Sequence, residues 1–120
     1  MNKYVRCIFF ITSLCLSHSV LADAMPEWLQ QVSEQKRQQP EAMLKLLLQH
    51  QSALTSLSAA LQAKWYLEHA ALLDALGRHQ QQQQAAELGL AALGEQQSLL
   101  RVQLLYELGF AREMQADYTT

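Results

Sequence analysis

The chain has 120 residues, with nine Lys and Arg against eleven Asp and Glu, so its net charge of −2 excludes the basic surface typical of nucleic-acid binding. Half of the residues are hydrophobic, which favours one packed domain over disorder. Leucine (23), glutamine (17) and alanine (16) are good helix formers, whereas four Gly and two Pro are too few for a turn-rich β-sandwich. We therefore expect an all-α fold.

The first predicted element is a signal peptide at residues 1–22. Lys3 and Arg6 precede an apolar segment of about ten residues, which is in the range for signal peptides and shorter than the about 20 residues of a spanning helix. Ala22 offers a signal-peptidase site, and Ala24 offers a second one. The alternative is an uncleaved signal anchor.

Cleavage after Ala22 defines residues 23–120 as the exported part. Lys3 and Arg6 leave with the signal peptide and no acidic residue does, so the net charge changes from −2 to −4. Cys7 and Cys15 leave as well. The exported part therefore has no disulfide and no thiol chemistry.

Five helices follow in chain order, because apolar residues recur with the helical period and no stretch alternates with a period of two. Ser58 is a suitable N-cap for the third helix, and Gly77 and Gly94 are suitable ends for the third and fourth. The predicted ranges are 26–38, 40 to 50–52, 59–76, 81–93 and 98–114, with a turn at 115–117.

Two local features of these helices have alternative interpretations. Trp28 and Trp65 lie at helical spacing, which favours core packing over the lining of a ligand groove. The glutamine run at 80–84 is interpreted as the solvated start of the fourth helix or as a lengthened turn.

An internal repeat relates the third helix to the fifth. A shift of 39 residues superposes Trp65 on Leu104, Ala70 on Gly109 and Gly77 on Ala116. Helical hairpins that repeat every 30–45 residues are typical of an α-solenoid, and the alternative is a helical bundle. We expect Gly109 to lie where the paired helix approaches most closely.

The repeat resembles the tetratricopeptide family. Leu108-Gly109-Phe110-Ala111 followed by Ala116-Asp117-Tyr118 is similar to the family's Leu-Gly, small-residue and turn pattern. Arg112 occupies the family's aromatic position, and the repeat of 39 residues is longer than the family's 34. The resemblance implies stacked antiparallel helical hairpins over residues 23–120.

The chain also resembles, more narrowly, the periplasmic sensory region of GGDEF-type diguanylate cyclases. The resemblance rests on the order of three features, which are an exported start, the segment Pro40-Glu41-Ala42-Met43 and the later repeat unit. In that family the repeats precede a transmembrane helix and a catalytic domain, neither of which occurs in these 120 residues. The resemblance thus implies a chain truncated at its C-terminus, with its membrane tether and cyclase activity in further sequence.

The exported part shows no pattern of catalytic chemistry. His50, His69 and His79 form no HxxxH or HExxH pair, and no Gly-x-Ser-x-Gly elbow or phosphate loop occurs. We therefore assign no catalytic, metal-binding or cofactor-binding residue and expect no cofactor. Asp74–Arg78 and Lys64–Glu68 are expected to be surface ion pairs.

The leading hypothesis is a non-enzymatic exported helical-repeat module that binds a peptide or protein partner on the concave side of its stacked hairpins. One alternative is the sensor fragment of a membrane-bound diguanylate cyclase or a related signalling enzyme. Another is a free-standing periplasmic protein with a structural role.

Overall fold

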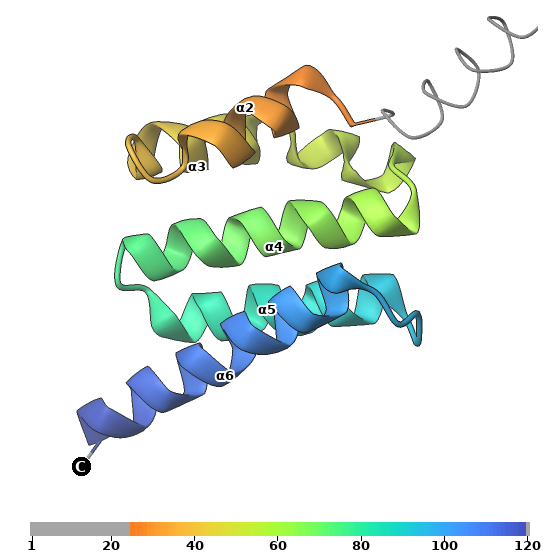
Figure 1. The fold of residues 1–120 in the computed structure, drawn as a ribbon. Coiled ribbons are helices and arrows are strands. Elements are labelled where there is room, and N and C mark those ends of the chain that lie inside the picture. Colours follow the sequence, from red (N-terminus) through yellow and green to blue (C-terminus); the bar gives the residue numbers. More distant parts are fainter. Residues whose placement is uncertain (1–24, 120) are drawn as a thin grey trace, which may run out of the picture.

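The computed structural model describes residues 25–119, with side chains described as far as Ala116, and the regular secondary structure of this part of the chain is entirely helical (Figure 1). The predicted signal peptide lies outside the described residues. The elements are α2 (Glu27–Gln35), α3 (Pro40–Gln49), the 3₁₀ helix η1 (Gln51–Ser56), α4 (Ala59–Ala75), α5 (His79–Leu93) and α6 (Leu99–Thr119). The all-α prediction is confirmed.

The predicted helix ends are confirmed at α4 and α5. The Ser58 hydroxyl caps α4 by accepting a hydrogen bond from the backbone N–H of Leu61, at 3.3 Å. Gly77 and Gly94 follow α4 and α5 with φ of 73° and 72°. Glycine adopts this left-handed region without a steric penalty, so both helices end where the sequence indicates.

Two parts of the helix assignment were wrong or missing. The sequence analysis missed η1, and α6 does not turn at 115–117 but continues to Thr119. The Gln115 amide donates to Gln83 Oε1 on α5, at 2.7 Å, and to the carbonyl of Ala111, at 3.1 Å. The bond to Gln83 holds α6 against α5 where a turn was expected. Ala116 is therefore helical and is not equivalent to Gly77.

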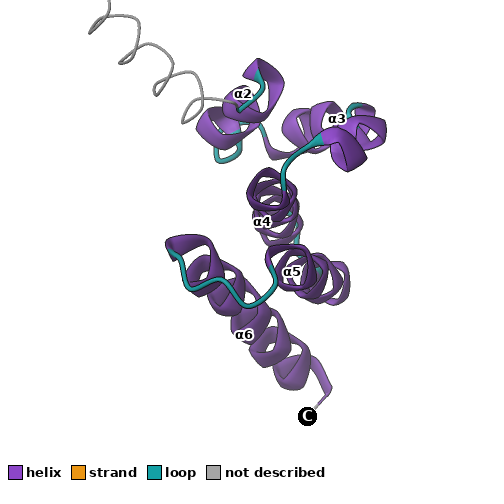
Figure 2. Cartoon of the chain, turned by 90° about the vertical axis from the view of Figure 1, so that its right-hand side faces the viewer, coloured by secondary structure: helices purple, strands orange, loops and turns teal. Residues whose placement is uncertain are grey.

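The helices form a layered stack with α4 at its centre. Consecutive helices pack against each other, and α4 also contacts both α2 and α6. Figure 2 shows α2 and α6 on one side of α4, with α3 and α5 on the other. In Figure 1, α4, α5 and α6 run alternately in opposite directions. Two faces of the molecule result, one crossing α2, α4 and α6 and the other crossing α3, α4 and α5.

The hydrophobic core follows α4, whose buried side chains face neighbours on both sides. Trp65 is almost completely buried and belongs to the core, as expected. Trp28 is partly buried and stacks on the imidazole of His50, with ring centroids 4.3 Å apart. The main core cluster contains Leu29, Val32, Met43, Leu44, Leu47, Trp65, Ala70, Leu72, Leu73, Ala85, Ala86 and Leu108.

Among the described residues, the glycine at the closest helix contact is Gly89. A Cβ at position 89 of α5 would lie 2.6 Å from Leu104 Cδ2 and 3.0 Å from Tyr66 Cβ. A Cβ at position 109 would meet no described atom within 4 Å, and Gly109 is exposed. On α6, Leu104 is the residue that meets Gly89, while the close approach predicted at Gly109 concerns the paired helix of a complete hairpin and stays a prediction.

Candidate functional site

A groove lies over α4, between the carboxyl end of α2 and the first half of α6. Its volume is about 370 Å³, which is within the range for ligand sites. We call it the α2–α4–α6 groove. Its lining residues are Lys36, Lys64, Leu67, Glu68, Ala71, Val102, Gln103, Tyr106 and Glu107.

A buried carboxylate with two lysines forms the α2 side of the groove. Lys36 Nζ lies 3.1 and 3.2 Å from the two Glu68 carboxylate oxygens. Lys64 Nζ lies 3.3 Å from Glu68 Oε1. The Glu68 side chain is fully buried, whereas the Lys36 and Lys64 side chains remain 25% and 22% exposed. A buried carboxylate is stable only when paired, so Glu68 fixes both ammonium groups at the groove.

A second polar network forms the α6 side. The Gln82 side-chain amide donates to Glu107 Oε2 at 2.7 Å, and its carbonyl oxygen lies 2.8 Å from His79 Nδ1. Burial raises the pKa of the Glu107 carboxyl, an effect that the Gln82 hydrogen bond partly offsets. Gln82 is fully buried, so the interpretation of the glutamine run as solvated fails at this residue.

The remaining groove wall is apolar and open to solvent. Val102 and Tyr106 on α6 line the groove and are largely exposed. Gln103 lies between them in the sequence and adds an exposed amide. The groove therefore combines hydrogen-bond donors, acceptors and apolar surface, contributed by three helices.

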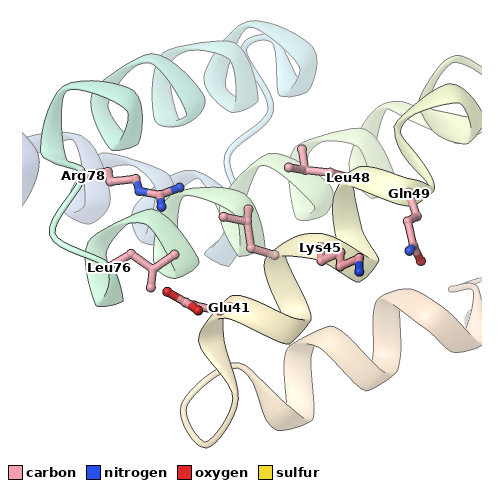
Figure 3. A pocket seen from close by; sticks show the side chains of 7 residues that line it. Glu41, Lys45, Leu48, Gln49, Leu76 and Arg78 are labelled. Carbon is pink, nitrogen blue, oxygen red and sulfur yellow. The ribbon is translucent and has the colours of Figure 1, made fainter.

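Two further depressions lie on the α3–α4–α5 face. Figure 3 shows one of about 550 Å³, with Glu41, Lys45 and Leu48 along α3 and with Leu76 and Arg78 across from them. No hydrogen bond or ion pair among its described lining residues fixes the charged side chains in place, in contrast to Lys36 and Lys64 in the groove.

The other depression, of about 350 Å³, is lined by uncharged side chains that include three glutamines, Trp65 and His69. Burial lowers the pKa of His69. The Trp65 indole nitrogen is buried and has no hydrogen-bond acceptor. Because this nitrogen is buried, it offers no accessible donor to a ligand in the depression.

The structure places the metal-ligating residue types and the two predicted ion pairs as follows. The described residues contain no group of three or more His, Cys, Asp or Glu side chains that could hold a metal ion. The Lys64–Glu68 pair is confirmed, but Glu68 is buried instead of exposed. Asp74 does not pair with Arg78 and lies 3.8 Å from His79 Nδ1.

Sequence analysis missed Lys36, Gln82 and Glu107 as residues of one site. They are separated by tens of residues in the sequence. Lys36 and Glu107 line one groove because α2 and α6 both pack on α4, and Gln82 reaches Glu107 from α5. The only local signal was the spacing of Lys64 and Glu68 on one helix face.

No protein-family model matches the chain, and comparisons with curated proteins and with solved structures find no significant similarity. Among the helices of the described part, none is long and apolar enough to cross a bilayer. The groove must therefore be interpreted from its own chemistry.

Proposed function

We propose that this protein is an exported helical-repeat module of the tetratricopeptide type, which binds a peptide segment of a partner protein in the α2–α4–α6 groove. The observation that carries the proposal is the groove itself, where fixed polar groups and exposed apolar side chains converge from three helices. Export is proposed from the signal-peptide pattern of residues 1–22.

The polar groups suit a peptide backbone, which offers both carbonyl acceptors and N–H donors. Each lysine ammonium has three N–H groups, and Glu68 occupies only part of this capacity. The partly exposed Lys36 and Lys64 can therefore donate to ligand carbonyls. Glu107, across the groove, uses one carboxylate oxygen for Gln82 and has the other as an acceptor for a ligand N–H.

The apolar groups suit a side chain of the same ligand. Tyr106 and Val102 are exposed by 67% and 62%, and both line the groove. An apolar ligand side chain placed against them would remove this surface from water, which is favourable. Aromatic residues with an accessible face are also common anchors in protein interfaces.

The test is selection of a random peptide library, displayed on phage, against the protein produced from the complete 120-residue sequence. We expect enrichment of related peptides that bind the wild type. Gln103→Arg should weaken their binding by about tenfold or more, because it places a large side chain in the groove. Gln103 is exposed and has no buried partner, so this variant should fold normally.

Gln81→Arg is the matched control, since it changes an exposed glutamine that lines a depression on the opposite face. Binding should survive in this variant. Absence of enriched peptides, or equal loss of binding in both variants, would contradict the proposed function.

A further inference from the structure

The outward face of α6 is apolar and uncovered by any described residue. Leu99, Val102, Leu105 and Tyr106 are 72%, 62%, 46% and 67% exposed, and they are most of the large exposed hydrophobic side chains in the described chain. Their helical spacing places them on one face together with the exposed Gly109. Figure 2 shows α5 and α4 on the other side of α6.

The corresponding face of α4 is covered by a helix. Under the 39-residue repeat, Leu105 and Gly109 correspond to Tyr66 and Ala70. Ala70 is fully buried, and Tyr66 packs against Gly89 of the antiparallel helix α5. The repeat therefore indicates that an antiparallel helix also fits the outward face of α6.

Gly109 marks the place where such a helix would come closest. Glycine within a helix is less favourable than alanine, and no contact among the described residues explains it at this position. At Gly89, the missing side chain leaves space on the helix surface, and the branched side chain of Leu104 from the neighbouring helix fills this space. A branched side chain from outside the subunit would fit at Gly109 in the same way.

We propose that the outward face of α6 binds α6 of a second copy of this chain, in an antiparallel and two-fold symmetric pair. Val102 of each copy packs over Gly109 of the other. In this register, Leu105 lies close to the two-fold axis and near Leu105 of the other copy. Tyr106 also lies near its counterpart in the other copy. The face is thus self-complementary.

The dipole of α6 supports this occupant. The same register places Glu113, a charged residue on this side of α6, beside Ser98 at the amino end of the other α6. A carboxylate is favourable at a helix amino end, where backbone N–H groups lack helical partners. A parallel pair would instead place the two Glu113 side chains together.

This proposal does not rest on peptide binding, but Val102 and Tyr106 belong both to this face and to the groove lining, so the pair and a bound peptide compete for these two side chains. Leu105 and Gly109 are absent from the lining of the α2–α4–α6 groove, whereas Gln103 lines it. Substitutions at Leu105 or Gly109 therefore test the pair, and Gln103→Arg tests the groove.

The first experiment is sedimentation equilibrium of the protein produced from the complete sequence. We expect a monomer–dimer equilibrium that Leu105→Lys and Gly109→Leu each weaken by about tenfold or more. The control is Leu88→Lys, which changes a similarly exposed leucine on α5 and should leave the equilibrium unchanged. A monomer at all accessible concentrations would overturn the proposal, as would tighter association of Gly109→Leu.

Cysteine cross-linking tests the register in a background with Cys7→Ser and Cys15→Ser. Leu105→Cys should form a disulfide-linked dimer under mild oxidation, and so should a mixture of Val102→Cys and Gly109→Cys chains. Leu88→Cys should remain largely uncrosslinked. Equal cross-linking at Leu105 and Leu88 would contradict the α6 interface, because random collisions would then explain both products.

Discussion

The substitution Gly89→Ala tests the packing of α5 against α4 and α6 directly. Alanine is favoured over glycine in a helix by about 1 kcal/mol. The added methyl group would lie 2.6 Å from Leu104 Cδ2 and 3.0 Å from Tyr66 Cβ. Leu104 is fully buried and Tyr66 Cβ is tied to its backbone, so neither atom can move freely. Overpacking typically costs about 1–3 kcal/mol, and we expect a net destabilisation of up to about 2 kcal/mol.

Gly109→Ala is the matched variant, because it makes the same change in a helix where the added Cβ has open space. It should stabilise the monomer by up to about 1 kcal/mol. When the free energies of unfolding of the two variants are subtracted, the helix-propensity contribution common to both cancels. The packing cost of about 2 kcal/mol remains, which corresponds to about 8–16 °C in Tm for a domain of this size.

The assay is thermal unfolding followed by circular dichroism at a protein concentration low enough to keep the chain monomeric. The Tm should be highest for Gly109→Ala, intermediate for the wild type and lowest for Gly89→Ala. If Gly89→Ala raises Tm as much as Gly109→Ala does, position 89 has room for a side chain and the close contact of α5 with Leu104 and Tyr66 is refuted.

Other predictions concern charge, pH and processing. Lys36→Met should destabilise the protein by about 1–3 kcal/mol in urea unfolding, because it leaves the buried Glu68 carboxylate short of a partner; Glu68→Gln should cost less, and the reverse order would contradict this account. The raised pKa of Glu107 means that the folded state binds its proton more tightly than the unfolded state, so its stabilising contribution is complete below about pH 4.5 and is lost as the pH rises through the folded pKa. Glu107→Gln should remove this slope from the free energy of unfolding, and an unchanged slope would exclude Glu107 as its source. Mass spectrometry of the exported protein should find a new amino terminus at Asp23 or Met25, and an intact chain in the cytosol would refute export.

The sequence predicted those helix ends that depend on local chemistry. Ser58 caps α4 and Gly77 follows it because their backbone and side-chain preferences act within a few residues. The end of α6 was predicted wrongly because the Gln115–Gln83 hydrogen bond joins residues from different helices. Such a contact cannot be derived from the period of one segment.

The site could be predicted less well than the fold. Lys64 and Glu68 are four residues apart on one helix, so their ion pair was expected. The burial of Glu68 depends on Lys36, which is 32 residues away and reaches the pair only through the packing of α2 on α4. The close approach predicted at Gly109 stays a prediction, because no described helix lies against that position.

The most direct test of the peptide-binding groove is an NMR titration of the isotope-labelled protein with a peptide selected from the random library. We predict that the largest backbone amide shifts occur in α4 and α6, at the residues around Glu68 and Glu107, while amides of α3 change little. Shifts concentrated in α3 and α5, or no shifts at saturating peptide, would contradict the assignment of the α2–α4–α6 groove as the binding site.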